Sequence, residues 1–205
     1  MINTNTLVKS FALSSVVATA TLLNAHAADL TAVPSGEYDV DPTHAYINFQ
    51  YNHLGLSNPT LGFDDFTVDL NLDTEDPTKS TVNVSIDPTS VISGSSIWTD
   101  HLTSGDWLDV ENHPEITFTS TSVTAAGDGA YMVSGDLMIK GETSPVELSV
   151  TINAAMNHPM SGDPVIGLDA SGDLLRSSFG LGKYAPAISD EVSLMISAEM
   201  VHAGS

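Results

Sequence analysis

Apolar and polar residues alternate with a period of two along most of this chain from Gly36 onward. Successive side chains of a β-strand point to opposite faces, so this period is typical of strands with one dry and one wet face. In the run at 46–52, for example, Ile47, Phe49 and Tyr51 alternate with tyrosine, asparagine and glutamine. The same alternation recurs over residues 67–73, 81–87, 131–139, 146–152, 166–174 and 192–198. The chain is therefore expected to consist almost entirely of β-strands.

Short turn sequences separate these runs, and no interval has the length and period of a crossover helix. They are rich in glycine, proline and aspartate, as in Gly127-Asp128-Gly129 and Lys140-Gly141. Connections this short join antiparallel neighbours. An antiparallel sheet with one dry face forms a sandwich or a closed barrel, and a barrel of about eight strands can hold one small ligand. We predict an all-β, antiparallel fold of about eight or nine strands, a sandwich or a closed barrel, without a second domain.

One stretch, residues 101–122, interrupts the strand pattern. His101–Val110 has the composition of a short helical or turn segment, and the chain then breaks at His113-Pro114. Proline disfavours a helical residue before it and cannot donate to a sheet ladder. A strand is predicted directly afterwards, at Glu115–Thr121. We expect this short helical segment between strands to close one end of the barrel or to frame its mouth.

Residues 1–27 have the features of a signal peptide. Lys9 provides a positive charge, Phe11–Leu23 is an uncharged and mostly apolar run, and the segment ends in the small-x-small pattern Ala-His-Ala. The apolar run is shorter than the roughly 20 residues that span a membrane, although an uncleaved anchor is the alternative. We expect cleavage after Ala27, export to the periplasm or beyond the cell, no stable membrane insertion afterwards, and a single domain over residues 28–205.

The charge is strongly negative, with 26 acidic and 5 basic residues, and there is no cysteine. This balance repels nucleic acids and anionic lipid surfaces, so neither is expected as a partner. Without disulfides, burial alone must stabilise an exported domain of this size. Solubility in an external medium explains the acidic surface, and metal binding by a periplasmic stress protein is the alternative.

Small residues occupy several positions on the apolar faces, namely Gly135, Ala170, Gly172 and Ala198. Filled barrels tend to carry bulky side chains at inward positions, whereas small residues leave room. Two interpretations are open. The interior contains a tunnel for a ligand, or small side chains pack against large ones and glycines mark bulges.

No catalytic or metal-binding motif is complete. The run at 69–80 resembles a calcium loop, but Thr74 stands at the glycine position and a serine at the last ligand position. The chain has no G-x-S-x-G elbow, no phosphate-binding glycine loop and no H-E-x-x-H pair. We predict no catalytic and no metal-binding residues. An enzyme with a site at the barrel mouth, using His101, Asp106 and Asp109, is a further alternative.

Several motifs follow one another along the chain from about Gly36. The most specific is His101-Leu102-x-Ser104-x-Asp106-Trp107-Leu108-Asp109-Val110, followed by Pro114 and Ile116-Thr117-Phe118-Thr119-Ser120. The others are Tyr38-Asp39-Val40-Asp41-Pro42-Thr43-His44, His53-Leu54-Gly55, Leu70-Asn71-Leu72-Asp73, Gly135-Asp136-Leu137, Lys140-Gly141-x-Thr143-x-Pro145-Val146 and Arg176-Ser177-Ser178-Phe179-Gly180. This combination resembles the bacterial YceI-like family of lipocalin-like, periplasmic polyisoprenoid-binding proteins. Trp107 stands where that family usually has phenylalanine.

The resemblance implies an extended, lipocalin-like antiparallel β-barrel of about eight strands, with a short helical segment between strands and a central tunnel. In the family this tunnel holds a long-chain amphiphilic lipid, such as a polyprenyl pyrophosphate, a ubiquinone tail or a fatty amide. The resemblance brings no catalytic activity and no cofactor besides such an isoprenoid lipid, and it implies a homodimer. The protein is then expected to transport, store or sequester an isoprenoid or acyl ligand.

The predicted ligand-binding residues combine inward apolar positions with polar groups near the helical segment. Tyr51, His53 or Trp107 could donate to a neutral headgroup, and Arg176 with Lys183 is the best available pair for a pyrophosphate. Burying a doubly charged headgroup needs charge-assisted donors, which are scarce here, so a neutral ligand is favoured. The full predicted set is Phe49, Tyr51, His53, Phe66, Trp107, Phe118, Leu137, Leu148, Leu168, Arg176, Phe179, Lys183 and Leu194.

Overall fold

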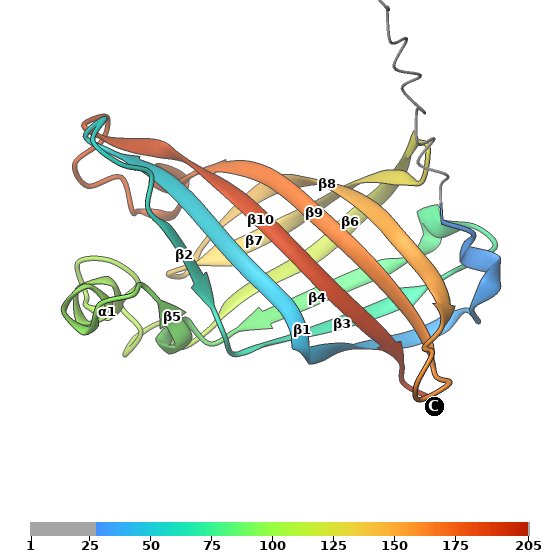
Figure 1. The fold of residues 1–205 in the computed structure, drawn as a ribbon. Coiled ribbons are helices and arrows are strands. Elements are labelled where there is room, and N and C mark those ends of the chain that lie inside the picture. The colour runs from blue at the N-terminus through green and yellow to red at the C-terminus, as the bar shows by residue number, and fades with distance from the viewer. Residues whose placement is uncertain (1–27, 205) are drawn as a thin grey trace, which may run out of the picture.

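The computed structural model describes residues 28–204, and the predicted signal peptide at 1–27 lies outside this range. Eight strands form a closed antiparallel barrel, because each pairs with its neighbour and the last pairs with the first (Figure 1). In order around the barrel they are β1 (Gly36–His53), β3 (Phe66–Leu72), β4 (Thr81–Ile86), β6 (Ile116–Gly127), β7 (Ala130–Ile139), β8 (Glu142–Asn157), β9 (Pro164–Leu175) and β10 (Ile188–His202). The predicted fold class is confirmed.

Two short strands extend the sheet at one end of the barrel. Strand β1 pairs with β3 through Gly36–Asp39 and then with β2 (Thr60–Phe63) through Ile47–Gln50. Strand β5 (Val91–Ile92) pairs in turn with β2. The change of partner along β1 leaves β2 and β5 beside the end of the barrel that also carries the helix α1 (Figure 1).

The helical segment begins earlier in the chain than predicted. Helix α1 spans Ser96–Thr103 and turns follow it, so the predicted helical or turn segment His101–Val110 consists of the last residues of the helix and these turns. The helix begins after the N-cap residue Ser95, whose backbone is extended, and it ends at the C-cap residue Ser104, whose backbone is extended again at φ −66° and ψ 164°. Asp109, in the turns that follow, adopts a left-handed φ of 51°. Four single-turn 3-10 helices complete the fold: η1 (Leu30–Ala32), η2 (Pro77–Lys79), η3 (Pro88–Ser90) and η4 (Arg176–Phe179).

No helix among residues 28–204 has the length and apolar character required to traverse a bilayer.

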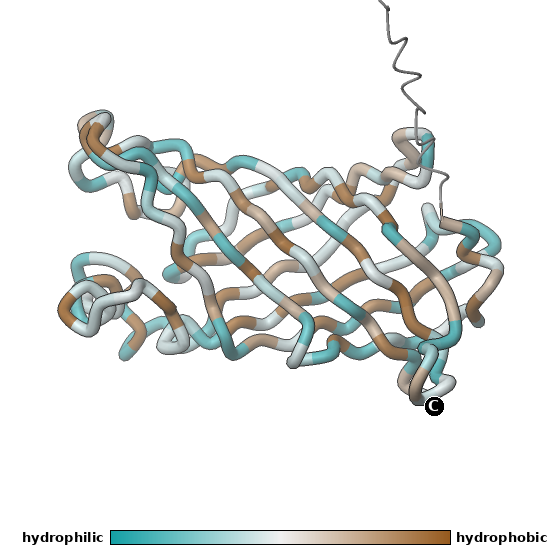
Figure 2. Tube along the Cα trace, in the orientation of Figure 1, coloured by the Kyte–Doolittle hydropathy of each residue, from teal (hydrophilic) through white to brown (hydrophobic). Residues whose placement is uncertain are grey.

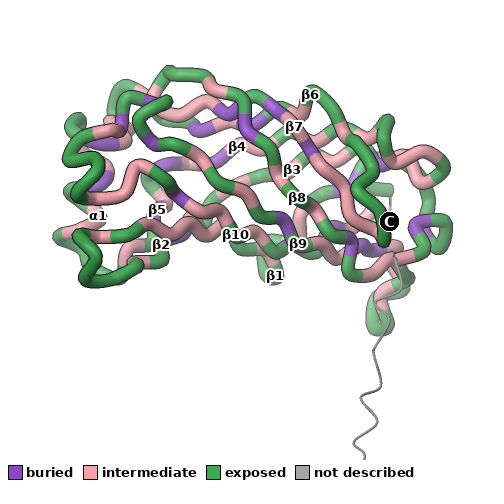
Figure 3. The backbone as a smooth tube through the Cα atoms, turned by 90° about the horizontal axis from the view of Figure 1, so that it is seen from above, coloured by how far each residue is buried: buried purple, intermediate pink, exposed green. Residues whose placement is uncertain are grey.

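The period-2 pattern of the sequence becomes an inside–outside pattern in the barrel. Hydrophobic and hydrophilic positions alternate along the strands, and buried positions are interspersed with exposed ones (Figures 2 and 3). Val133, Leu137 and Val146, for example, are buried on the inward face of β7 and β8. The predicted inward register of these strands is therefore confirmed.

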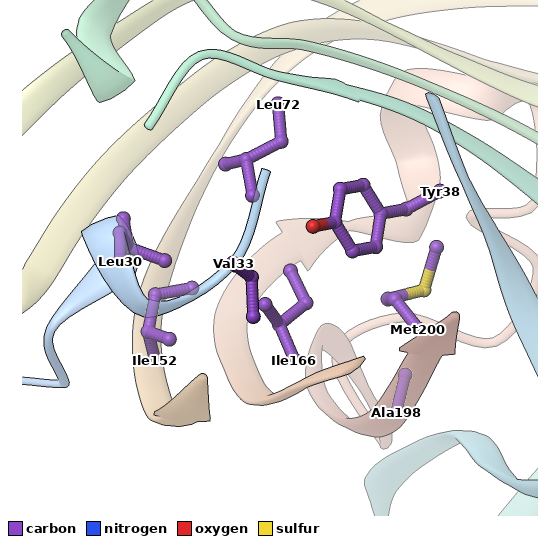
Figure 4. Close-up of a cluster of buried hydrophobic side chains, with 8 residues drawn as sticks. All are labelled: Leu30, Val33, Tyr38, Leu72, Ile152, Ile166, Ala198 and Met200. Atoms are coloured by element: carbon purple, nitrogen blue, oxygen red, sulfur yellow. The ribbon is translucent and has the colours of Figure 1, made fainter. Parts of the chain in front are cut away.

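A compact hydrophobic cluster fills the end of the barrel opposite α1 (Figure 4). Leu30 and Val33, from the segment before β1, pack there against residues of the barrel wall. The hydroxyl of Tyr38 donates to the backbone oxygen of Pro34 at 2.7 Å, which fixes this segment to β1. The other members of the cluster are Leu72, Ile152, Ile166, Ala198 and Met200. This cluster is the floor of the interior space.

Candidate ligand-binding site

The barrel encloses a cavity of about 320 Å³ whose surface is almost entirely apolar. It runs from the floor, at Leu30 and Ile166, to the α1 end, at Trp98, Trp107 and Arg176. Ligand pockets typically measure about 300–1,000 Å³. An apolar space of this size inside eight strands is what a barrel offers to one small or slender ligand.

Most of the predicted binding residues line this cavity. They come from β1, β3, β6, β7, β8, β9 and β10, from the turns after α1 and from η4, so the closed sheet brings together positions far apart in sequence. The predicted residues at the cavity are Phe49, Tyr51, Phe66, Trp107, Phe118, Leu137, Leu148, Leu168, Arg176 and Leu194.

Three predicted residues do not line the cavity. The pairing of β1 with β10 shifts between Tyr51 and His53, so the inward alternation ends before His53. Phe179 is fully buried, but it lies in η4 and packs into the cluster with Val146 rather than on the cavity surface. Lys183 is exposed on the β9–β10 connection.

The small residues on the apolar faces have two different roles. A Cβ at Gly135 would lie 2.4 Å from the ring of Phe118, and one at Gly172 would lie 2.5 Å from the backbone oxygen of Glu147. These two glycines therefore admit a neighbouring side chain or backbone, which is packing of small against large. Ala170 and Ala198, in contrast, face the cavity and leave it room.

Aromatic rings cluster at the α1 end of the cavity. The rings of Trp98 and His101 stack with their centroids 5.0 Å apart. The ring of Trp107 lies edge-on to that of Trp98, with 6.4 Å between the centroids. The indole Nε1 of Trp107 donates to Nε2 of His101 at 2.7 Å. Because an indole has a single N–H, this bond uses the donor that the sequence suggested for a ligand headgroup. It also requires the neutral His101 tautomer with its proton on Nδ1.

Sequence reasoning missed Trp98, which lines the cavity from α1. The signal was present, since the Ser93-Gly94-Ser95 run before it is a helix N-terminal pattern.

Arg176 is the one charged residue buried among residues 28–204, with 7% of its surface exposed. Its guanidinium donates four hydrogen bonds to backbone oxygens: Nε to Ser189 at 2.8 Å, Nη2 to Ile188 at 2.9 Å, and Nη1 to Lys183 at 2.9 Å and to Leu181. Within the described part of the chain it forms no ion pair. Arg176 therefore holds the β9–β10 connection in place and leaves a positive charge at the cavity.

The surroundings of this charge are weakly polar. The guanidinium carbon of Arg176 lies 5.8 Å from the centre of the Trp107 ring. Burial lowers the pKa of Arg176, while the charges of Asp190 and Tyr51 oppose that shift. Burial also raises the pKa of Tyr51, against a hydrogen bond with Trp98 and the charge of Arg176. Both side chains keep their ordinary protonation at neutral pH, since Arg stays protonated and a tyrosine with a raised pKa stays neutral.

Two lysines from other connections bind the turns that follow α1 through an ion pair and a hydrogen bond. Lys183 Nζ forms an ion pair with Asp106 Oδ2 at 2.8 Å, and Lys140 Nζ donates to the backbone oxygen of Gly105 at 2.9 Å. The segment that carries Trp107 is thus tied to the β7–β8 and β9–β10 connections at the same end of the barrel.

The residues of the enzymatic alternative are occupied by local contacts. His101 accepts from Trp107, Asp106 pairs with Lys183, and Asp109 Oδ1 accepts from Asn112 Nδ2 at 2.9 Å.

For a metal, residues 28–204 contain one group of ligand-type side chains, formed by Asp41, His44 and Glu199, whose ligand atoms lie within 4.8 Å of one another. It lies at the bulge between β1 and β10, away from the cavity-lining residues.

A closed eight-stranded antiparallel barrel around an apolar cavity defines a lipocalin-like β-barrel. Residues 38–200 match the YceI-like domain family. Protein YceI of Escherichia coli O157:H7 is 35% identical over 169 residues, which cover 82% of this chain and 87% of that protein. The chain belongs to the YceI-like family.

Solved structures share the fold. BcnA of Burkholderia cenocepacia superposes with a TM-score of 0.70 at 24% identity, over 78% of this chain and 98% of BcnA. A domain from Saccharophagus degradans, described as a polyisoprenoid binding domain implicated in plant cell wall breakdown, superposes with a TM-score of 0.55 at 14% identity. That match covers 82% of this chain and 99% of the domain.

Proposed function

We propose that this protein is an exported, non-enzymatic carrier that holds one long-chain lipid in its barrel for transport, storage or sequestration. The ligand is an isoprenoid of the quinone or polyprenyl type, or an acyl chain. The observation that carries the proposal is the apolar cavity of about 320 Å³ running from the floor at Leu30 to Trp107 and Arg176.

The energetics of the cavity favour an aliphatic occupant. Empty core cavities cost about 24 cal/mol per Å³, so leaving this one vacant forgoes on the order of 8 kcal/mol. A buried methylene contributes about 0.8 kcal/mol, and about ten of them supply a similar amount before ordering costs. The chain of the ligand therefore provides the binding free energy, and its headgroup provides orientation.

The polarity of the two ends sets the orientation. The floor is a cluster of aliphatic side chains with one buried tyrosine, whereas the α1 end carries the charge of Arg176. Four of the five N–H donors of Arg176 are already used by backbone oxygens. One donor suffices for a neutral acceptor such as a quinone carbonyl, but not for a pyrophosphate. We place a neutral headgroup beside Arg176 and the tail toward Leu30.

The relatives and the N-terminal sequence support the same function. A structural neighbour is described as a polyisoprenoid binding domain, and its fold is the fold of this chain. The apolar run Phe11–Leu23 and the Ala-His-Ala pattern that follows support export of the carrier, and with it a periplasmic location.

The test is to extract the purified protein with organic solvent and to determine the masses of the extracted molecules and of the intact complex by mass spectrometry. The expected result is one lipid per barrel. Ala170→Phe places a ring in the cavity and is expected to exclude long-chain lipids from it, whereas Ser171→Phe places the same ring on the exposed face and leaves the bound lipid unchanged. A folded wild-type protein that stays empty and refuses a long-chain quinone or polyprenol contradicts the proposal.

A further inference from the structure

Large apolar side chains are exposed at the tips of three connections around the α1 end. Leu54 and Leu56 lie in the β1–β2 hairpin, Ile97 lies in α1, and Tyr184 lies in the β9–β10 connection. Their exposed fractions are 52%, 81%, 82% and 58%. We name these four residues the apolar crown. Exposed apolar groups that gather at one place on a soluble protein mark a contact surface.

The crown is held in place by defined hydrogen bonds. The backbone N–H of Leu54 donates to the oxygen of Ala187 at 3.2 Å, which joins the β1–β2 hairpin to the β9–β10 connection. Asn52 Oδ1 accepts from the backbone N–H of Gly55 at 2.8 Å. Leu54 and Tyr184 have left-handed φ values of 60° and 69°, which are unfavourable for side chains of this size. The fold thus bears a conformational cost at two positions where it leaves an apolar side chain in water.

The crown is also continuous with the cavity. The ring centroids of Tyr184 and Trp107 lie 6.4 Å apart, and Trp107 lines the cavity. Trp98, next to Ile97 in α1, lines it as well. A surface that touches the crown is therefore one side chain away from the interior.

The charge distribution identifies the kind of partner. The chain carries 26 acidic residues, but residues 51–63 and 174–189, which contain two of the three crown connections, carry none. The single lysine in these two segments, Lys183, is neutralised by Asp106. The third connection carries the exposed Asp100 in α1, three residues after Ile97. Two of the three crown connections are thus apolar and free of carboxylates, while the acidic remainder of the molecule, Asp100 included, repels anionic membranes.

We propose that the apolar crown docks the protein on a bilayer of zwitterionic phospholipids. The proposal rests on the proposed function, because a carrier of a long apolar chain must exchange it with a membrane. Direct contact spares the chain from crossing water, which is unfavourable for every exposed methylene. Leucine and isoleucine enter the acyl boundary, and tyrosine suits the headgroup level because its ring is apolar and its hydroxyl polar. Few apolar side chains and no charge attraction give weak, reversible docking.

The test is co-sedimentation of the purified protein with phosphatidylcholine vesicles, together with the rate of ligand transfer from them. The double variant Leu56→Ser/Ile97→Ser removes the two most exposed crown side chains. Met160→Ser is the matched control, since Met160 is 88% exposed in the β8–β9 connection at the other end of the barrel. We expect the double variant to lose at least about tenfold in vesicle partitioning and in transfer rate, and the control to match the wild type.

Binding of the same ligand from detergent solution separates this proposal from the proposed function. Both variants are expected to bind it as the wild type does, because no crown residue lines the cavity. A wild-type protein that does not bind the ligand from detergent solution would overturn the proposed function. A wild type that stays in the supernatant with neutral vesicles overturns the docking proposal. If transfer then depends on the crown only in the presence of other proteins, the partner is a protein.

Discussion

The indole N–H of Trp107 donates to Nε2 of His101 across 2.7 Å, so the helix α1 and the turns after it form one unit. The same indole ring lies beside the guanidinium of Arg176. This unit therefore forms the polar end of an otherwise apolar cavity.

Removing the acceptor of this bond should destabilise the fold. His101→Ala leaves the Trp107 N–H without its partner in a buried position, and an unsatisfied buried donor costs about 1–3 kcal/mol. The free energy of unfolding, measured in urea, is expected to fall by that amount. Asp100→Ala, an exposed neighbour in the same helix, is expected to change it by less than about 0.5 kcal/mol. Equal effects for the two variants would contradict the role given to the bond.

Arg176 is expected to stabilise the β9–β10 connection in a way that lysine cannot replace. Lysine lacks the planar fork that donates in several directions at once. Arg176→Lys should lower the free energy of unfolding by about 2–4 kcal/mol, since several charge-assisted bonds are lost in part. Hydrogen exchange of amides in residues 180–188 should accelerate with it. Unchanged exchange in this segment would show that the arginine does not hold it.

The ion pair between Lys183 and Asp106 should control ligand exchange more than stability. It is exposed, and exposed pairs contribute about 0–1 kcal/mol. Asp106→Asn is expected to leave the unfolding midpoint nearly unchanged and to speed release of a fluorescent lipid. The matched control is Asp76→Asn, which removes the exposed pair with Lys79 near the floor. Equal release rates from both variants would mean that the turns after α1 do not limit exchange.

The bulge between β1 and β10 should have a distinct pH response. Hydrogen bonds from His44 and then Thr43 lower the pKa of Asp41 from 3.8 to about 2. A depressed folded-state pKa contributes stability that is present above the unfolded value of 3.8 and is lost as the pH falls toward about 2. In carboxyl NMR titrations, His44→Ala is expected to raise the pKa of Asp41 toward its ordinary value.

His44 responds in the opposite direction. Its hydrogen bond with Asp41 raises its pKa above 6.5, so its contribution is present below that value and is lost as the pH rises through the folded-state pKa. An imidazole titration of Asp41→Asn should move the pKa of His44 back down. No movement in either variant would show that the two side chains do not interact in solution.

The strands were predictable because a closed barrel has an apolar inner face and a polar outer face, so apolar and polar residues alternate along each strand. Ile47, Phe49 and Tyr51 face the cavity as their alternation indicates. His53 continues the same period but follows a register shift, and a shift leaves no mark on the alternation itself. The helical segment was expected too late in the chain because His101–Val110 contains residues compatible with a helix or turn, whereas the N-cap position of α1, Ser95, lies earlier.

Other parts of the site depend on contacts between distant residues. Leu30 and Val33 close the floor from a segment that has no strand period, so no local pattern marks them as core. Arg176 is buried because four backbone oxygens of the following connection converge on it. Only the folded connection reveals that convergence. Composition alone left open whether the small residues on the apolar faces pack against neighbours or leave room for a ligand. In the structure the two glycines admit a neighbouring group, and the two alanines leave room in the cavity.

The most direct test of the central claim is calorimetric binding of a series of neutral lipids that share one headgroup and differ in chain length. A hollow interior predicts that each added methylene strengthens binding by up to about 0.8 kcal/mol until the chain reaches the floor at Leu30, after which affinity levels off. Ala170→Phe should bring that plateau to shorter chains. An affinity that is independent of chain length, or no binding at any length, would contradict a ligand inside the barrel.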